Sequence, residues 1–277
     1  MKKFLLLLLI CLFFAGCNNK TATQPKTKPE NLRIVSLAPS VTNMITGLGA
    51  EDYLVGVTKF CQNPEKKWTE IGGYMDFNRE VFVSLKPNMV FLAPYHTEAI
   101  EICEEMNIEY HILNLSSYKD IRKNIVIIGE HTGKLEKAGE LVDNFNKELF
   151  KIKPSKKHPR VLIVLDRNYG TKDLGKIYAV GDGGIFAEPL SIIGAFNAYE
   201  GLTETPVLTA EGVVSLNPDI IIDVVPENRK DISKDWEGLK INAVKNRKLY
   251  VLAGKEYSVP DQFFYRTVQK LAEIINE

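Results

Sequence analysis

The clearest periodic pattern in this chain lies between Lys134 and Lys153. Apolar residues recur there at spacings of three and four, which places them on one stripe of a helix. They are Leu135, Ala138, Val142, Phe145, Leu149 and Ile152. Lys147 and Lys151 suit the exposed carbonyls of the last turns, and Pro154 ends the pattern. This stretch therefore predicts a helix about 30 Å long, at 1.5 Å per residue.

A second helical pattern precedes the first. Ile121, Ile125 and Ile128 follow the same spacing, and Gly129 and Gly133 are expected to break or kink the chain before the longer helix begins. We therefore predict two consecutive helices. On periodicity alone, the longer one is equally compatible with a crossover helix inside one domain and with a connection between two domains.

The segments on either side of these helices repeat each other. Glu80-VFVSLKPNMVF aligns without a gap to Glu211-GVVSLNPDIII at a constant offset, since 211 − 80 = 131 and 218 − 87 = 131. Each copy predicts a helix start, a proline-containing turn and an apolar strand. The repeat favours two similar α/β lobes joined by one helix, although unrelated helix–turn–strand units can converge on similar short sequences.

Apolar runs bounded by turn residues predict the strands of each lobe. In the first lobe they are Leu32–Leu37, Leu54–Thr58, Met89–Ala93 and Tyr110–Leu113; in the second they are Val161–Leu165, Ile177–Val180, Pro218–Val224 and Leu249–Leu252. A helix from about Asp261 ends the chain. Alternating strands and helices imply an α/β fold with parallel sheets, whose ligands bind beyond the carboxyl ends of the strands.

The N-terminus has the pattern of a secretion signal. Two lysines precede thirteen uncharged residues, 4–16, a run too short to favour a membrane-spanning helix. Phe14-Ala15-Gly16-Cys17 resembles the lipobox of bacterial lipoproteins, in which the cysteine receives lipid and becomes the new N-terminus. Residues 1–16 are thus predicted to be a signal peptide and Cys17 the lipidation site. Ordinary cleavage near Ala15-Gly16 is the alternative.

The remaining chain divides into four predicted segments. Residues 17–30 are poor in aliphatic side chains and are predicted to be a disordered tether between the lipid and the folded part. Residues 31–118 form the first lobe, 119–156 the helical segment and 157–277 the second lobe. Removing residues 1–16 removes two lysines, so the charge becomes 33 − 35 = −2, which argues against a nucleic-acid partner. Cys61 and Cys103 either pair as a disulfide or are two separate buried side chains.

Two stretches carry a family resemblance. RIVSLAPSVTNMITGLGAEDYLVGVTKFCQNP and IGGYMDFNREVFVSLKPNMVFLAP closely resemble the class III substrate-binding proteins of ABC importers, which carry cobalamin, iron–siderophore complexes or haem. The similarity runs from about Leu32 to the C-terminus, and VGVTKFCQNP and GGYMDFNRE look closest to the cobalamin-binding branch. The resemblance implies two Rossmann-like lobes with parallel sheets, one long rigid α-helix joining them and a ligand cleft between the lobes.

The resemblance also implies a docking role for two acids. In the family, one surface glutamate on each lobe contacts arginines of the membrane permease, and the matching positions here are Glu80 and Glu211. The repeat places these two acids at equivalent points independently. An acid at a helix start is by itself commonly only a favourable partner of the helix dipole.

Loops that follow the predicted strands supply the candidate ligand contacts. They are Phe60, Tyr74, Tyr95, His96, Arg167, Tyr169 and Tyr257. Aromatic faces from both lobes suit a broad, flat macrocycle or chelate. Haem is an alternative, because Tyr74 in GGYM resembles a tyrosine that ligates iron in some haem-carrying relatives, with His96 as a second candidate.

Enzyme and metal-ion binding classes find little support. Gly181-Asp-Gly-Gly184 lacks the spacing of a phosphate loop or dinucleotide fingerprint, and the chain has no recognisable nucleophile motif. Of the four histidines only His96 lies on a candidate cleft loop, so direct zinc or manganese binding is not expected, and no cofactor or metal site is assigned.

The predicted function is a monomeric, lipid-anchored substrate-binding protein on the outer side of the membrane. It would deliver cobalamin or a related corrinoid to an ABC permease and, through it, to the ATPase. A ferric siderophore or haem is the alternative ligand. A ligand sensor without a permease, or an extracellular enzyme on the same lobes, are alternatives of other classes.

Overall fold

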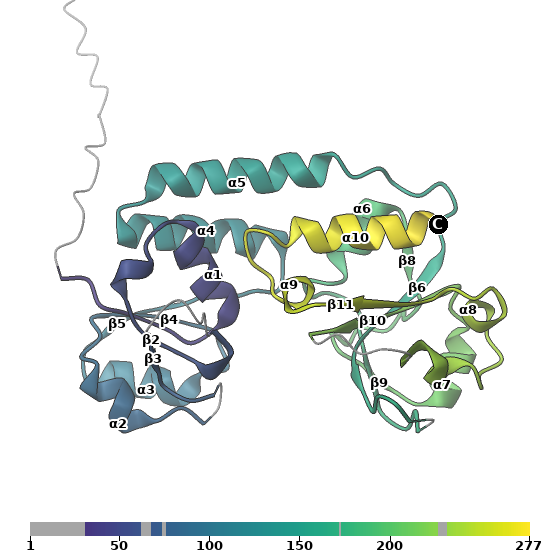
Figure 1. Ribbon diagram of the computed structural model, residues 1–277, viewed down its shortest axis with the longest axis horizontal. Helices are drawn as coiled ribbons and strands as arrows, with labels where there is room; N and C mark the ends of the chain where they lie inside the picture. Colours follow the sequence, from purple (N-terminus) through teal and green to yellow (C-terminus); the bar gives the residue numbers. More distant parts are fainter. Residues whose placement is uncertain (1–30, 62–67, 74–75, 172, 227–231) are drawn as a thin grey trace, which may run out of the picture.

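The computed structural model describes residues 31–61, 68–73, 76–171, 173–226 and 232–277, and it contains two lobes that lie side by side (Figure 1). The first lobe has a five-stranded parallel sheet of order β3-β2-β1-β4-β5. Its strands are β1 (Ile34–Ser36), β2 (Leu54–Val57), β3 (Thr69–Glu70), β4 (Met89–Leu92) and β5 (Glu109–Ile112). The four predicted strands are confirmed, and β3 is added at the edge.

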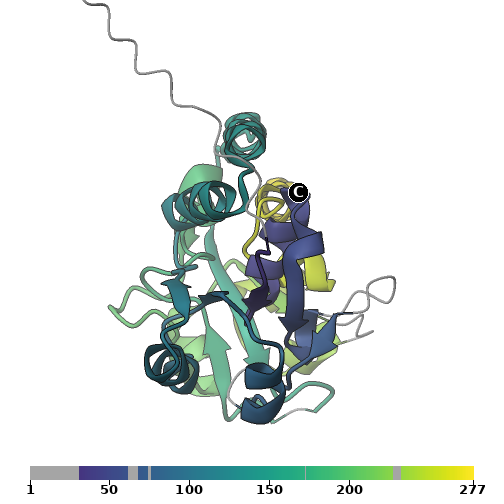
Figure 2. The same ribbon diagram turned by 90° about the vertical axis from the view of Figure 1, so that its left-hand side faces the viewer.

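Helices cover both faces of this sheet. They are α1 (Pro39–Gly47), α2 (Arg79–Ser84), α3 (Thr97–Glu105) and α4 (Tyr118–Thr132). Ile34 and Phe91 share one core with residues of α1 and α4, whereas Val35 and Val90 share another with residues of α2 and α3. Successive strand residues point to opposite faces, so a strand that is apolar throughout needs a helical layer on each side. Figure 2 views these layers from the end of the lobe.

The second lobe has a six-stranded sheet of order β11-β10-β6-β7-β9, with β8 paired to β6. Its strands are β6 (Arg160–Arg167), β7 (Ile177–Ala179), β8 (Phe196–Asn197), β9 (Val207–Leu208), β10 (Ile220–Val225) and β11 (Leu249–Ala253). Its helices are α6 (Glu188–Ile193), α7 (Ala210–Leu216), α8 (Asn242–Lys245), α9 (Lys255–Ser258) and α10 (Tyr265–Asn276). All four predicted strands of this lobe are present.

One edge of the second sheet departs from the expected parallel arrangement. Strand β7 runs antiparallel to both β6 and β9. The connection from Arg167 to Ile177 spans only residues 168–176, and a parallel crossover needs about a dozen residues or more. The prediction of wholly parallel sheets is therefore wrong for β7, because the chain returns directly.

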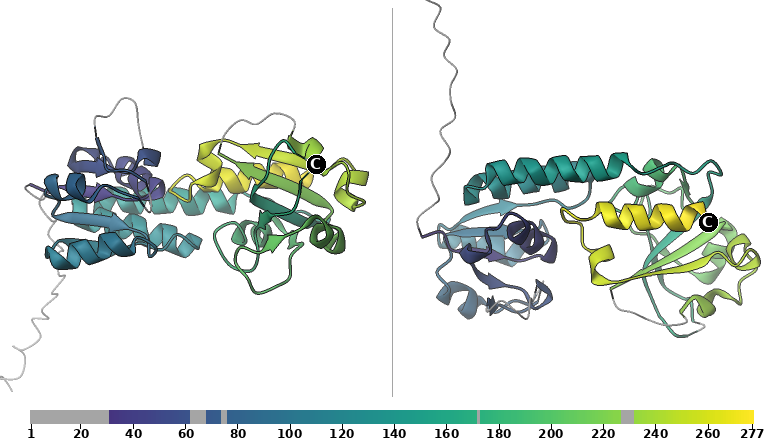
Figure 3. Two further views of the ribbon diagram at one scale, coloured as in Figure 1. Left: turned by 90° about the horizontal axis from the view of Figure 1, so that it is seen from below. Right: turned by 45° about the horizontal axis from the view of Figure 1, so that its top comes forward.

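Two consecutive helices join the lobes, as the sequence predicts. Helix α4 ends at Gly133, whose φ of 68° is left-handed, and α5 (Leu135–Phe150) then runs back toward the second lobe (Figures 1 and 3). Gly129 does not break α4, contrary to expectation. A Cβ at Gly129 would lie 2.6 Å from the Cβ of Ala138, so this glycine lets α4 and α5 pack closely.

We expect Gly129→Ala to destabilise the fold by about 1–3 kcal/mol, since the added methyl group meets an atom fixed to the α5 backbone. The matched control is Gly139→Ala on α5, where an added Cβ meets no atom within 4 Å. That change should stabilise the helix by about 0.5–1 kcal/mol through backbone entropy. Urea unfolding of both variants measures the difference, and equal shifts in the same direction would contradict the packing role of Gly129.

A single hydrophobic core joins the lobes on the α5 side. It includes residues of α1, α4, α5, α6 and α10 and the facing side of both sheets. The ring of Phe145 on α5 lies 5.8 Å from that of Tyr118 and 6.3 Å from that of Tyr265. The right view of Figure 3 shows α10 over the second lobe, roughly parallel to α5, whose C-terminal end lies above it. The lobes are thus held by shared packing as well as by the connecting chain.

The two cysteines of the first lobe lie in different hydrophobic cores. Cys61 and Cys103 are both buried and both free, on opposite sides of the first sheet. Burial raises the pKa of Cys103 to about 11, which keeps this thiol protonated at neutral pH. Of the two alternatives from the sequence, separate buried side chains are confirmed. Among the described residues, no helix combines the length and apolar character needed to cross a bilayer.

Candidate functional site

The internal repeat is present in the structure as two matching helix starts. Asn78 caps α2 by accepting the backbone N–H of Val81 at 3.0 Å, and Thr209 caps α7 by accepting that of Gly212 at 3.3 Å. Glu80 and Glu211 each follow their cap by two residues, because 80 − 78 = 2 and 211 − 209 = 2. The two acids therefore occupy the same position in their helices.

The repeat continues at the ends of these helices. Lys86 and Asn217, again 131 residues apart, both adopt left-handed φ values, of 48° and 44°. An arginine near the start of each lobe then caps the helix. Arg33 Nε donates to the Leu85 carbonyl at 2.9 Å, and Arg160 Nη1 donates to the Leu216 carbonyl at 2.9 Å. The two lobes thus build the unit that carries each acid with the same hydrogen bonds.

Both acids are exposed on one side of the molecule. Helices α2 and α7 lie on the side opposite α5, one on each lobe (Figure 1), and the side chains of Glu80 and Glu211 are exposed. The pKa of Glu211 is lowered by a hydrogen bond from its own backbone N–H and by the Thr209 hydroxyl. Glu211 therefore carries its charge at neutral pH, and two separated acids are exposed on that side of the molecule.

The carboxyl ends of several strands point toward the opposite lobe. The chain that leaves β5 reaches Tyr118, whose backbone N–H donates to the Glu188 carboxylate of the second lobe at 2.6 Å. The chain that leaves β11 reaches Asp261, which accepts from Asn43 Nδ2 of the first lobe at 2.6 Å. The loops in which parallel sheets bind ligands are thus brought to the junction of the lobes.

A pocket of about 300 Å³ opens at this junction, and we call it the interlobe pocket. Its lining includes Leu115, Ser116, Leu165, Val180, Phe186 and Pro260. The first two come from the β5–α4 connection and the others from the second lobe. Gly183 and Gly184 also line it, in the turn-like stretch Gly181-Asp-Gly-Gly184, which has no phosphate-loop or dinucleotide-binding spacing. Their left-handed φ values of 82° and 73° explain the glycines, and only the fold shows that the turn borders a pocket.

The aromatic candidates lie around strand ends rather than in the wall of the interlobe pocket. Phe60 and Tyr95 follow β2 and β4 and are 48% and 49% exposed, which leaves their faces available for contact. Tyr257 on α9 is half-buried and adjoins Ser258, which lines the pocket. Tyr169 is half-buried beside Arg167. Tyr74 lies outside the described residues.

His96 is placed beneath Tyr95 rather than in the open. It is 3% exposed, its ring centroid lies 4.4 Å from that of Tyr95, and its Nδ1 accepts the backbone N–H of Ala93 at 2.9 Å. Burial lowers the pKa of His96, so the ring is neutral at pH 7. This geometry supports the orientation of Tyr95 and gives no support to a direct ligand contact by His96.

Arg167 is likewise buried and engaged by the protein. Its guanidinium donates to both carboxylate oxygens of Asp223, at 2.9 and 3.1 Å, and to Asp235 at 2.7 Å. Asp223 also accepts from the indole N–H of Trp236 at 2.8 Å. The side chain of Arg167 therefore fixes the loop after β6, and the predicted ligand contact finds no support in its geometry.

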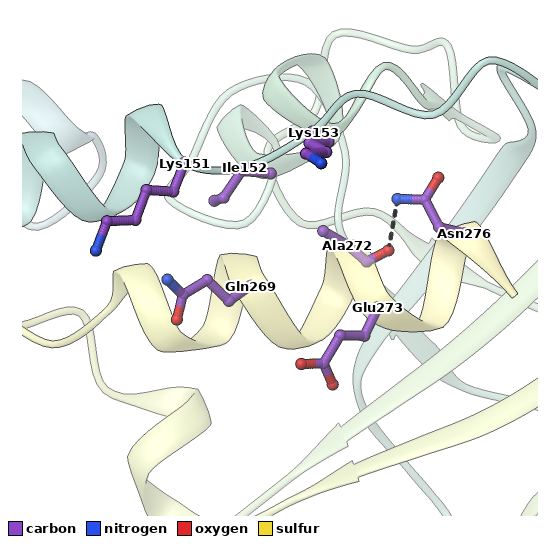
Figure 4. Close-up of a pocket in the computed structure, with 7 residues that line it drawn as sticks. All are labelled: Lys151, Ile152, Lys153, Gln269, Ala272, Glu273 and Asn276. Carbon is purple, nitrogen blue, oxygen red and sulfur yellow. Dashed lines mark hydrogen bonds between the residues drawn. The ribbon is translucent and has the colours of Figure 1, made fainter.

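A second hollow lies away from the strand ends. It measures about 320 Å³ and lies between the segment that follows α5 and one face of α10 (Figure 4). Lys151, Ile152 and Lys153 line one side, and Gln269, Ala272, Glu273 and Asn276 line the other. No aromatic residue lines it, so the aromatic candidates and this hollow belong to different parts of the molecule.

Comparison with known proteins identifies the family. Residues 34–256 match the family model described as periplasmic binding protein, and the chain belongs to that family. The chain is 31% identical to an uncharacterized ABC transporter substrate-binding lipoprotein, YvrC of Bacillus subtilis, over 88% of this chain and 87% of the relative.

Two further similarities differ in extent. A vitamin B12-binding protein of Vibrio vulnificus is 29% identical over 104 residues, which are 36% of this chain and 38% of the relative. The crystal structure of the periplasmic haem-binding protein HutB of Vibrio cholerae superposes with a TM-score of 0.75 at 18% identity, covering 89% of this chain and all of that one. The latter similarity shows the common fold of two α/β lobes.

Proposed function

We propose that this protein captures cobalamin or a related corrinoid outside the cytoplasm and delivers it to the permease of an ABC importer. The observation that carries the ligand assignment is the sequence similarity to vitamin B12-binding proteins, which reaches 29% identity over 104 residues. The similarity to a haem-binding protein is one of fold, at a lower sequence identity of 18%. Haem or a ferric siderophore is therefore the second candidate.

Aromatic side chains at the strand ends support a large, flat ligand, which would extend beyond the interlobe pocket. An interlobe pocket of about 300 Å³ is at the lower end of the range for small-molecule sites, and a corrin ring with its side groups exceeds it. Such a ligand would place one part in the pocket and cover aromatic side chains beyond it. Tyr95 and Tyr257, one from each lobe, are the described aromatic residues that we assign to this role.

The membrane attachment rests on Cys17, which lies outside the described residues. Its support is the lipobox-like Phe14-Ala15-Gly16-Cys17 and the lipoprotein relative at 31% identity. Two acyl chains suffice for stable anchoring, whereas one gives marginal binding. The full chain should fractionate with membranes, whereas the Cys17→Ser variant should be released from them or remain as the uncleaved precursor. Unchanged fractionation together with an unchanged mass would contradict the assignment.

Titration with cobalamin, haem and a ferric siderophore tests the ligand. The soluble protein from Thr21 onward is followed by visible absorbance and by tryptophan emission, to which the half-buried Trp68 contributes. Saturable one-to-one binding of cobalamin with no chemical change is expected. Tighter binding of haem or the siderophore would transfer the proposal to the second candidate, and turnover of a ligand would contradict the binding-protein function.

We expect Tyr95→Ala combined with Tyr257→Ala to weaken cobalamin binding more than tenfold. Each buried aromatic ring contributes on the order of 1–3 kcal/mol to a contact of this kind, and about 1.4 kcal/mol is tenfold in affinity. The matched control is Phe150→Ala, since this aromatic ring at the end of α5 is 93% exposed. Unchanged affinity in the double variant would show that these rings do not contact the ligand.

A further inference from the structure

Three side chains that are distant in the sequence converge on the outer part of the first lobe. Glu109 and His111 lie on β5, two residues apart and so on the same face of the strand, and His131 lies in the last turn of α4. One potential ligand atom from each lies within 4.8 Å of the others. His111 and His131 are 131 − 111 = 20 residues apart in the sequence, so only the fold brings them together.

The separations match the coordination of a small metal ion better than direct hydrogen bonds. Glu109 Oε1 lies 3.4 Å from His111 Nε2 and 3.5 Å from His131 Nδ1. Both exceed the usual length of an N–H···O hydrogen bond, roughly 2.7–3.2 Å. A tetrahedral zinc ion with bonds of about 2.0–2.2 Å has ligand–ligand edges of about 3.3–3.6 Å. Two of the three ligand–ligand separations therefore already fit one ion, and the third, between the two imidazole nitrogens, is at most 4.8 Å.

The surroundings hold the two imidazoles in place. The ring of Phe91, a buried residue of the interior strand β4, stacks on His111 at 5.7 Å between centroids and meets the edge of His131 at 6.3 Å. The side chains of both histidines are 28% exposed, and that of Glu109 is 57% exposed. The cluster is thus partly ordered by the core and remains open to an ion from solvent.

This cluster is distinct from the interlobe pocket. Glu109 begins β5, at the end of the strand opposite to its connection with α4. His131 lies thirteen residues along α4 from Tyr118, which contacts the second lobe, and that length of helix spans about 20 Å. An ion bound here would be a resident of the protein, separate from a ligand carried between the lobes.

We propose that Glu109, His111 and His131 form a binding site for a divalent transition-metal ion, with Zn²⁺ as the best match. Two imidazoles and one carboxylate are a common set of three protein ligands for zinc, and water completes the tetrahedron. The ion would join the start of the edge strand β5 to the end of α4. Its binding therefore stabilises the outer part of the first lobe.

The test uses the full chain purified in detergent and stripped with a chelator, titrated with Co²⁺ and then Zn²⁺. We expect one equivalent of Co²⁺ to give the visible absorption of a tetrahedral site, and Zn²⁺ to displace it, as the usual affinity order predicts. Zn²⁺ should also raise the melting temperature. Absence of stoichiometric binding of either ion would overturn the proposal.

Variants assign the site to these residues. His111→Gln, His131→Gln and Glu109→Gln should each weaken binding by about tenfold or more, because each removes one ligand. The matched control is His158→Gln, since His158 lies in the segment before β6, with its Nδ1 2.8 Å from the Gly194 carbonyl. Far-UV circular dichroism identifies any variant that fails to fold, and the remaining two then decide. Wild-type affinity in folded variants, or an equal loss in His158→Gln, would overturn the assignment.

Discussion

Cells that carry the Glu80→Lys, Glu211→Lys double variant are expected to lose most of their ligand uptake, while the isolated protein keeps its ligand affinity. The two acids occupy equivalent positions of α2 and α7, are exposed and lie on the side opposite α5. Reversal puts a cation against the permease arginines that the family resemblance implies. Changes to a buried charge contact of this kind cost roughly 2–5 kcal/mol.

Each single variant should reduce uptake by itself. The acids stand on different lobes with no shared hydrogen-bond partner among the described contacts, so their effects on docking free energy should roughly add. Since about 1.4 kcal/mol is tenfold in affinity, even one reversal should be measurable at low protein concentration. Uptake of radiolabelled cobalamin into cells gives the readout.

Glu136→Lys is the matched control for charge reversal. Glu136 is an exposed acid in the first turn of α5, two residues after the cap at Lys134, and thus has the same helix position as Glu80 and Glu211. Its helix lies on the opposite side of the molecule (Figure 1). Uptake should remain normal in this variant. Normal uptake in the Glu80→Lys, Glu211→Lys variant as well would show that both acids serve only their helices.

Arg167→Met is expected to destabilise the protein by about 3–5 kcal/mol, the usual cost of leaving one partner of a buried ion pair uncompensated. The side chains of Arg167 and Asp223 are 0% and 1% exposed, and the guanidinium also holds Asp235. Without it, Asp223 keeps only the Trp236 indole among the donors described above. Urea unfolding at pH 7 measures the loss of stability.

The stability deficit of Arg167→Met should shrink as the pH falls. Burial raises the pKa of Asp223, and the hydrogen bonds and charge of Arg167 oppose that shift. Removing Arg167 therefore raises the pKa of Asp223 in the folded protein further above the pKa of the same carboxyl group in the unfolded chain. A carboxyl group with a higher pKa in the folded state binds more protons when folded, so acidification favours folding of the variant relative to neutral pH. An unchanged deficit at lower pH would contradict this account.

An exposed ion pair provides the comparison for Arg167. Arg79 Nη2 lies 2.6 Å from Glu105 Oε2, and these side chains are 51% and 60% exposed. Arg79→Met should change stability by less than about 1 kcal/mol, because water already solvates both charges. A similar loss in Arg79→Met and Arg167→Met would mean that burial does not set the cost.

The local sequence pattern was sufficient to predict those elements whose structure depends on a single local feature. The apolar runs at Met89–Leu92 and Ile220–Val225 form interior strands of the two sheets, since a strand buried on both faces must be apolar throughout. The 131-residue repeat predicted two like units, and the structure reproduces them down to their caps. Gly133 was expected to interrupt the helices and does so through its left-handed φ.

Other features depend on which distant segments meet. A short return segment made β7 antiparallel, and Gly129 stays helical because α5 packs against it. In the sequence, Arg167 follows the predicted strand Val161–Leu165 and was therefore a candidate ligand contact. In the fold, Asp223 and Asp235 surround its guanidinium and bury it.

The sequence by itself determined the elements, the two-lobe plan and the equivalent positions of Glu80 and Glu211, because these follow from local spacing and from the repeat. Only the tertiary structure decided which side chains share a site. The interlobe pocket forms where the β5–α4 connection lies beside a turn of the second lobe. The cluster of Glu109, His111 and His131 forms where the end of α4 lies beside β5. Such contacts arise from packing between segments, for which spacing along a single chain carries no signal.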